Sequence, residues 1–416
     1  MKFSRSICIN LLVSWLFIYF TGKLLFDTVP YIFELFSIGL FAWCAFLLVY
    51  SRTATDLHTV TLFITFLVFT GYVLLNGILQ DDFSQLARAV YEYIFYILIF
   101  FAMLWLLPQA NLKKCLKIFA FWGLLIACLS WVEFFTKTLL IADPVENYLE
   151  FRANVFSRSF LTHGAVLGFF ALACMDICYR ERKPLWFVAG LFCYISIFAT
   201  ASRGPLVACG VGLILQFMLN AYISCRHSWK RFAANMLFLF GIVAVCVVMF
   251  GTFLTGNELI DNALLRVRSI FNWTGDAGNA GRLLLWNQAL DWWHSSPWFG
   301  IGPSQTGSWG EGSIGVTESG VLKRLAELGV VGFVIFYFFI ACILIRAIRT
   351  YKRQDDLGKR DMTLWFSLVT AILINDCILQ VTEEIMIAFF LWTALAGLEC
   401  IGQTDRFLKG DIHHES

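Results

Sequence analysis

The chain has 416 residues, of which 59% are hydrophobic, 17% are aromatic and only 14% are charged. A soluble domain carries about 25% charged residues, so this composition excludes a soluble enzyme and a disordered chain. The formal net charge of +2 is too small for binding to nucleic acid through bulk charge. The class that remains is an all-α polytopic membrane protein.

Apolar runs divide most of the chain into segments long enough to cross a bilayer, which takes about 20 residues per helix. We expect about twelve transmembrane helices, with charged or turn-forming breaks between them. Their approximate ranges are 7–26, 31–50, 58–79, 89–107, 115–136, 160–178, 185–201, 204–224, 233–255, 327–348, 362–380 and 385–402.

The basic residues predict the orientation, because Lys and Arg in short loops stay in the cytoplasm. With the N-terminus inside, most of the 31 basic residues fall on the cytoplasmic side. This places both termini in the cytoplasm and one long loop outside. The expected organisation is nine helices in 1–255, the outer loop in 256–326, three helices in 327–402 and a polar tail in 403–416.

Six arginines break this charge rule because they lie on the outer side. They are Arg152, Arg158, Arg203, Arg266, Arg268 and Arg282. Guanidinium groups are preferred partners of phosphate, so the set predicts a phosphate-bearing substrate at the outer face. The alternative is that single members extend toward the interface and pair with lipid phosphate.

Arg203 stands in a very short break, Thr200 to Pro205, between two expected spans. Proline suits the first turn of a helix, so Arg203 is expected at a helix N-terminus. Both the helix dipole and the side-chain charge attract anions there. An ordinary hairpin with an arginine extended toward the interface is the other interpretation.

The long outer loop contains an expected amphipathic helix, because Leu283, Trp286, Leu290 and Trp293 recur at helical spacing. Such a helix can lie in the membrane interface. Its tryptophans suit either the aromatic belt of the bilayer or stacking against sugar faces.

Glu318 precedes the apolar helical run that follows the long loop. One interpretation is that it only stabilises a helix N-terminus through the dipole. The other is that it acts as a general base at the membrane surface and takes a proton from a hydroxyl nucleophile. Nearby arginines would then stabilise an anionic leaving group.

Other chemistries find little support in the sequence, which has no H-E-x-x-H, P-loop or G-x-S-x-G motif. No metal and no cofactor are expected. His163 and His294 are isolated. Glu34 and Asp376 are carboxylates within expected spans and therefore functional candidates by default, but two scattered acids are weak support for an ion pathway.

Taken in order, five segments resemble the O-antigen ligase/polymerase superfamily. They are Arg152 to Phe156, Ser202-Arg203-Gly204, Arg282 to Trp286, Pro297 to Gly302, and Leu325 to Gly329. The resemblance implies a GT-C-like membrane glycosyltransferase at the periplasmic face of the bacterial inner membrane. Its substrate would be an oligosaccharide linked to undecaprenyl pyrophosphate, and the protein would also contact membrane lipids.

The same resemblance implies roles for individual residues. Arg203 and Arg282 would hold the pyrophosphate, with Arg152 and Arg158 beside them. Trp286, Trp293, Arg266 and Arg268 would contact the glycan or the interface. No nucleotide sugar or metal would be needed, and a chain-length regulator is a partner by analogy.

The position of Glu318 decides between the two branches of the superfamily. Ligases usually carry a His-containing pair about eleven residues before the helix glycine, and here that count back from Gly329 reaches Glu318 and Ser319. The acid resembles polymerases, so we expect a repeat-unit polymerase with Glu318 as base. A ligase acting on lipid A-core and a transporter of the lipid-linked glycan are the alternatives.

Overall fold

The computed structural model describes residues 57–80, 83–109, 112–138, 151–155, 159–225, 277–307 and 314–410, with single positions between these ranges. The spans expected at 7–26, 31–50 and 233–255 lie outside them, apart from a few such positions. All regular structure in the described ranges is helical.

The helices follow the apolar runs of the sequence. Their bounds are α3 (Leu57–Ile78), α4 (Phe83–Ala89), η1 (Val90–Phe95), α5 (Tyr96–Leu106), η2 (Leu107–Gln109), α6 (Leu112–Thr136), α7 (Phe160–Glu181), α8 (Pro184–Ile195), η3 (Ser196–Thr200), α9 (Arg203–Ser224), α12 (Ala277–Ser295), α13 (Gly320–Arg353), α14 (Asp356–Ile378), η4 (Val381–Glu383) and α15 (Ile385–Gly410).

Seven helical segments of the described chain are long and apolar enough to cross a membrane. They are His58–Ile78, Ser84–Leu104, Leu112–Thr136, Phe160–Glu181, Arg203–Ser224, Gly320–Arg353 and Asp356–Ile378. Two shorter apolar helices cover Pro184–Thr200 and Ile385–Ile401. The chain is therefore a polytopic helical membrane protein, and the total of twelve spans stays a prediction.

The chain forms two compact units. Unit 1 comprises Met1–Ala110, Gly281–Gln354 and Asp376–Ser416, and unit 2 comprises Asn111–Ala280 and Asp355–Asn375. The boundaries fall inside α12 and α14, so each of these helices contributes residues to both units.

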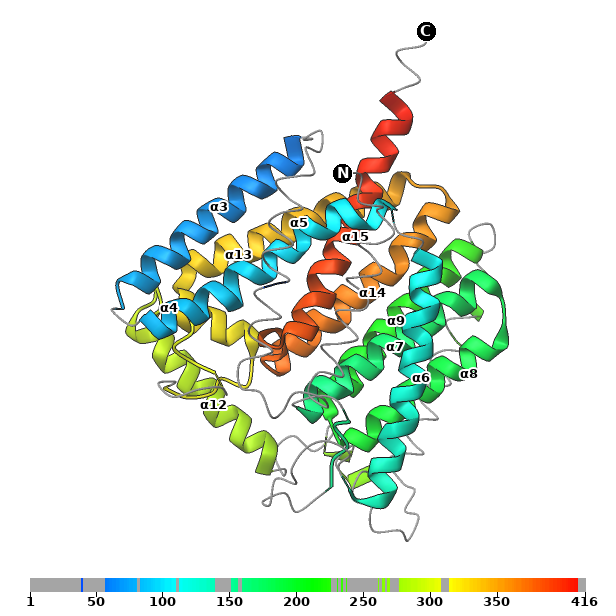
Figure 1. Ribbon diagram of the computed structural model, residues 1–416, viewed down its shortest axis with the longest axis horizontal. Helices are drawn as coiled ribbons and strands as arrows, with labels where there is room; N and C mark the ends of the chain where they lie inside the picture. The colour runs from blue at the N-terminus through cyan, green and yellow to red at the C-terminus, as the bar shows by residue number, and fades with distance from the viewer. Residues whose placement is uncertain are drawn as a thin grey trace. The chain divides into compact units, whose positions relative to one another are not determined.

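In unit 1, α13 packs against α3 and α15, and α15 also packs against α5 (Figure 1). Aromatic rings fill the space between these helices. Phe336 lies 5.6 Å from Phe69 between ring centroids, and Phe339 lies 5.4 Å from Phe100. Such tilted and edge-on pairs add to the attraction from burial alone.

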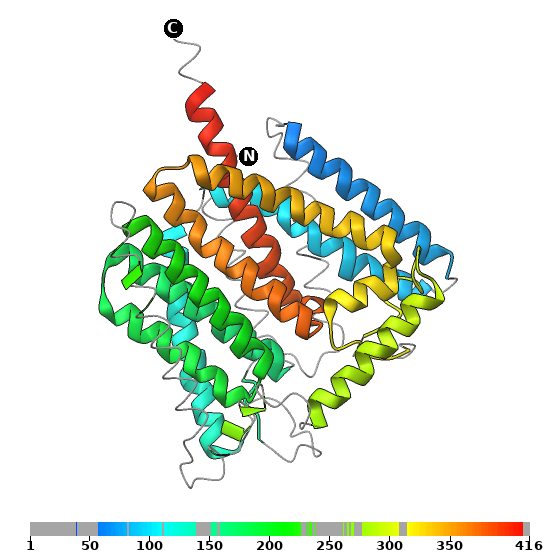
Figure 2. The same cartoon turned by 180° about the vertical axis from the view of Figure 1, so that it is seen from behind.

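Unit 2 is built around α7, which packs against α6, α8 and α9 (Figure 2). Glycines on α7 allow both η3 and α9 to approach closely. A Cβ atom at Gly168 would lie 2.1 Å from the Sγ of Cys209, and one at Gly164 would lie 3.0 Å from the Oγ1 of Thr200. Small residues at such interfaces are typical of helix packing in membranes, where dispersion contacts replace the hydrophobic effect.

Several helices extend beyond their expected limits: α14 begins at Asp356 instead of 362, and the run from α4 to α5 begins at Phe83 instead of 89. α13 begins at Gly320 instead of 327, because Ser319 caps it by accepting a hydrogen bond from the Leu322 amide. α15 continues to Gly410, beyond the expected end at 402. Apolar patterning marks the part of a helix suited to lipid, and polar residues such as Arg406 are compatible with further helix.

Candidate active site

Three of the residues expected in the site meet in unit 1. The Nε of Arg282 donates to Oε2 of Glu318 at 3.4 Å, and the indole Nε1 of Trp286 donates to the Glu318 carbonyl at 3.2 Å. Arg282 and Trp286 are four residues apart and therefore share one face of α12. The side chain of Glu318 remains 30% exposed, so it is paired and still accessible to a substrate.

Glu318 has an uncommon backbone conformation, with φ at 51°. Non-glycine residues in the left-handed region carry strain that the surrounding structure must hold in place. Its two neighbours are fastened: Ser319 caps α13, and the Thr317 hydroxyl lies 2.8 Å from Oε1 of Gln380. The backbone around Glu318 is therefore fixed on both sides.

The expected helix of the long loop is present as α12, and the two tryptophans of its apolar stripe have different partners. Trp286 contacts Glu318, whereas Trp293 donates from Nε1 to the Pro297 carbonyl at 3.1 Å. Leu283 is 40% exposed and Ala289 is 1% exposed. Trp293 is thus tied to the end of its own helix, and its contact with glycan or interface stays a proposal.

The Pro297 to Gly302 and Leu325 to Gly329 motifs dock onto one another. Ile301 N donates to Ala326 O at 2.9 Å, and Val330 N donates to Pro297 O at 2.9 Å. Gly329 interrupts α13 with φ at 59°, and Gly300 opposite it has φ at 75°. A Cβ atom at Gly329 would lie 2.4 Å from the Trp298 carbonyl oxygen, so only glycine fits.

We expect Gly329→Ala to destabilise the protein by at least about 2 kcal/mol, because strain at positive φ is added to the clash with backbone atoms. The measurement is the apparent melting temperature in detergent. Gly71→Ala is the matched control, since a Cβ atom there meets nothing within 4 Å, and its expected effect is below about 1 kcal/mol. Equal melting temperatures for the two variants would contradict the docking of the motifs.

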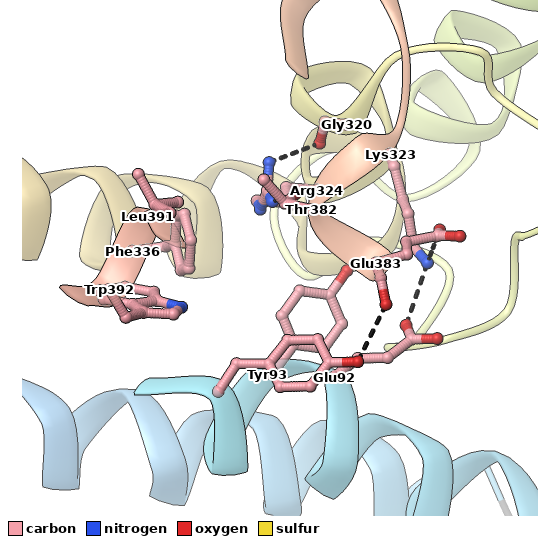
Figure 3. A pocket seen from close by; sticks show the side chains of 11 residues that line it. Glu92, Tyr93, Gly320, Lys323, Arg324, Phe336, Thr382, Glu383, Leu391 and Trp392 are labelled. Carbon is pink, nitrogen blue, oxygen red and sulfur yellow. Dashed lines mark hydrogen bonds and ion pairs between the residues drawn. The ribbon is translucent and has the colours of Figure 1, made fainter. Parts of the chain in front are cut away.

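A buried charge cluster, which the sequence reasoning missed, lies in the same unit. The Nζ of Lys323 contacts carboxylate oxygens of Glu383, of Glu92 at 3.0 Å and of Glu327 at 3.7 Å. Figure 3 shows the ammonium between Glu92 and Glu383. Arg88 pairs with Glu92 at 2.8 Å. Charges inside apolar segments were the available signal, but spacing alone does not reveal their partners.

Glu327 anchors the loop that follows Gly302. Its side chain is fully buried and accepts hydrogen bonds from the amides of Ser304 and Thr306, both at 2.8 Å. The hydroxyls of Thr306 and Tyr93 also donate to it, at 2.7 and 2.5 Å. A buried carboxylate is stable only when its oxygens are satisfied in this way, so Glu327 has a structural role.

A π-helical turn, η1, interrupts the run from α4 to α5 and carries both Glu92 and Tyr93. Both side chains reach the cluster, where they contact Lys323 and Glu327 respectively. π-Helical turns are frequent at functional sites. Here the turn brings two consecutive residues into one buried polar region.

Asp376, a functional candidate in the sequence, forms a buried ion pair. Nη1 of Arg324 donates to its Oδ2 at 2.5 Å, and the Thr382 hydroxyl donates to its Oδ1 at 2.7 Å. These contacts join α13 to the end of α14 and to η4. Glu34, the other carboxylate singled out within a span, lies outside the described residues.

A pocket of about 440 Å³, including space open to solvent, lies beside the cluster. Glu92, Lys323 and Glu383 line one part of it, and Phe336, Leu391 and Trp392 gather at another (Figure 3). Burial raises the pKa of the Glu383 carboxyl to about 7; Lys323 opposes this rise, and Glu92 and Glu327 add to it.

In unit 2, Arg203 is the first residue of α9, as expected. Its Nη1 contacts the hydroxyl of Ser269, and the Ser269 carbonyl accepts from Asn279 at 3.3 Å. The preceding residue, Ser202, donates to the Phe160 carbonyl at 3.2 Å. The N-termini of α7 and α9 therefore begin side by side.

Arg152 lies against the same helix N-terminus, with its guanidinium carbon 4.3 Å from the centroid of the Phe160 ring. Glu133 holds this segment by accepting from the amides of Asn154 and Val155, both at 2.9 Å. Arg152 thus lies at the N-terminus of α7 and Arg203 at that of α9, and helix N-termini favour anions.

Three further arginines were expected to contribute to the site. Arg158 and Arg266 lie outside the described residues, and Arg268 is the neighbour of Ser269 in the chain. Within the described ranges no group of three or more His, Cys, Asp and Glu residues is arranged to hold a metal ion. The metal-independent reaction stays a prediction.

The fold defines an integral membrane protein, and Glu318, paired with Arg282 and still accessible, is its candidate reactive group. Residues 185–337 match a family model described as O-antigen ligase. The match includes Arg203, Arg282 and Glu318, and it supports the superfamily resemblance without separating ligases from polymerases. No curated protein matches the chain.

Proposed function

We propose that the protein is a polysaccharide repeat-unit polymerase. It transfers a glycan from undecaprenyl pyrophosphate to the terminal sugar hydroxyl of another lipid-linked repeat. The observation that carries the proposal is the contact of Glu318 with Arg282 and Trp286, which brings together two segments of the superfamily pattern. The enzyme acts in the bacterial inner membrane, with its site facing the periplasm.

In the proposed reaction Glu318 accepts the proton of the acceptor hydroxyl. The hydroxyl oxygen forms a bond to the anomeric carbon of the donor, and the bond from that carbon to the pyrophosphate oxygen breaks. The leaving group takes the electron pair, and the anomeric configuration inverts. Arg282 orients the carboxylate of Glu318.

Arg203 and Arg152 neutralise the departing pyrophosphate, with Arg282 contributing a third guanidinium in the proposed assignment. Stabilising the charge that develops on a leaving group is a large term in such reactions. The assignment of Arg203 and Arg152 rests on the paired helix N-termini of unit 2. Arg158, Arg266 and Arg268 contribute positive charge in the same proposal, and a chain-length regulator is the proposed partner.

A ligase is the second candidate, because the matching family model, described as O-antigen ligase, supports both branches of the superfamily. In that case the same base and arginines act, and the acceptor is lipid A-core. An acid at the place where ligases usually carry histidine is the reason for preferring the polymerase.

The test is transfer by purified protein in liposomes that contain lipid-linked repeat units. A ladder of longer lipid-linked chains identifies a polymerase. Product that forms only after lipid A-core is added identifies a ligase and overturns the polymerase assignment. Movement of the glycan across the bilayer with no new glycosidic bond identifies a transporter and overturns both enzymes.

A further inference from the structure

Gln380, just before η4, connects the segment around Glu318 to the charge cluster. Its Oε1 lies 2.8 Å from the Thr317 hydroxyl and 3.3 Å from the Thr317 amide nitrogen. Its Nε2 donates to Oε2 of Glu383 at 3.4 Å. One amide side chain therefore spans the space between Thr317 and Glu383.

Thr317 is a suitable place from which to control Glu318. Its side chain is fully buried, and its hydroxyl also lies 3.0 Å from the Ser319 carbonyl. Thr317 thus contacts the residue beyond Glu318 as well as Gln380. Because Glu318 has a strained backbone, its conformation depends on these neighbouring contacts.

Glu383 uses its two oxygens for different partners. Oε1 contacts the Lys323 ammonium of α13, and Oε2 accepts from Gln380. The other charged groups around Glu383 are Glu92 of η1, Glu327 of α13 and Arg88 of α4, which pairs with Glu92. Tyr96 donates to the Glu383 carbonyl at 2.9 Å and so holds the backbone of η4.

We propose that Gln380 is a positioning residue for Glu318, and that the ionised Glu383 carboxylate keeps the Gln380 amide in the orientation that binds Thr317. The proposal rests on the proposed function, since it concerns the base of that reaction. Gln380 acts through Thr317 and does not contact the reacting atoms.

The contact has a defined dependence on pH. The pKa of Glu383 is about 7, and Lys323 occupies Oε1, so a proton added below that pH binds Oε2. The protonated oxygen is a hydrogen-bond donor, and the Nε2 of Gln380 opposite it is also a donor, so their contact is unfavourable. Gln380 then turns its own oxygen toward Glu383, and the Thr317 amide and hydroxyl lose the oxygen to which both of them donate. Activity should therefore rise with pH through about 7.

The first experiment measures kcat and KM for glycan transfer from pH 5.5 to 8.5. Gln380→Leu should lower kcat by roughly 10- to 100-fold, as expected for a misplaced catalytic group, with KM unchanged and without the rise near pH 7. Glu383→Gln should also lose that rise and stay at the low rate at every pH, because Lys323 takes its amide oxygen and its amide NH2 then faces the Nε2 of Gln380, as the protonated carboxyl does. Gln288→Leu, the same change on α12, is the control and should stay within about 2-fold.

Thr317→Ser and Thr317→Val separate positioning from stability. The serine variant keeps the hydroxyl and should retain activity, whereas the valine variant should resemble Gln380→Leu. The proposal is overturned if Gln380→Leu stays within 2-fold of the unmodified protein, or if the rise near pH 7 persists in Glu383→Gln.

Hydrogen exchange of the segment 314–319 supplies a readout that needs no activity. Gln380→Leu should increase exchange at Thr317 and Glu318, and the unmodified protein should show the same increase below pH 7, after correction for the intrinsic rate. If the amides of Thr317 and Glu318 stay protected from exchange in Gln380→Leu, the positioning role is overturned. If hydrogen exchange changes as expected but the unmodified protein transfers no glycan, the proposed function is overturned and the contact of Gln380 with Thr317 stands.

Discussion

Glu318→Gln should reduce the rate of glycan transfer by roughly 10²- to 10⁴-fold, the usual contribution of a general base. Glutamine has nearly the same shape and its oxygen still accepts from Arg282, so the pair of side chains stays together. What it lacks is the ability to take a proton. The measurement is the initial rate with purified protein and lipid-linked repeats, together with the length of the chains formed.

Two further variants test whether the loss of rate comes from the missing proton acceptor. Asp291→Asn removes an exposed acid from α12, the helix that carries Arg282, and should leave the rate unchanged. Glu318→Asp keeps the carboxylate but shortens its reach, so its rate should lie between those of the glutamine variant and the unmodified protein. Chains of normal length made at a normal rate by Glu318→Gln would remove Glu318 from the role of base.

Arg203→Ala should lower kcat/KM by roughly 10²- to 10³-fold, the effect of removing one group that stabilises developing negative charge. The guanidinium belongs to the first residue of α9, where the helix dipole would add to its attraction for the proposed pyrophosphate. Arg203→Lys keeps the charge without the planar fork and should recover only part of the loss. The measurement is kcat/KM for the lipid-linked donor.

Lys183→Ala is the matched control for Arg203, because it removes an exposed cation near the opposite end of α7 in the same unit. Its activity and melting temperature should both be unchanged. If Arg203→Ala keeps normal kcat/KM while it inserts and melts normally, the pyrophosphate is held elsewhere. If Arg203→Ala lowers the melting temperature but leaves kcat/KM normal, the role of Arg203 is the structural contact with Ser269.

Hydropathy and charge predicted the class of protein and the limits of most described helices, since lipid requires long apolar segments. They also singled out Arg203, Arg282 and Glu318 as charges on the unfavoured side or at a helix start. The spacing of Arg282 and Glu318 could not show that they touch. That contact depends on how α12 folds back on the segment before α13.

The apolar stripe expected along α12 illustrates the limit of periodic patterns. Trp286 and Trp293 share its spacing, but one donates to Glu318 and the other to Pro297. A pattern indicates which residues lie on one face of a helix, and the neighbours of that face are set by loops. Gly300 and Gly329 were visible as motif glycines, and the reason for them is the close passage of two backbones.

The low charged fraction by itself determined that this chain lies in a membrane, and the sides on which those charges fall indicated an outer site for phosphate. Only the tertiary structure decided which charges meet. Lys323, Glu92 and Glu383 come from three separate segments. In the sequence each of them is an isolated charge, with nothing to indicate its partners. Their mutual burial, with the Gln380 bridge to Thr317, follows from helix packing, because long-range contacts depend on three-dimensional arrangement and not on local pattern.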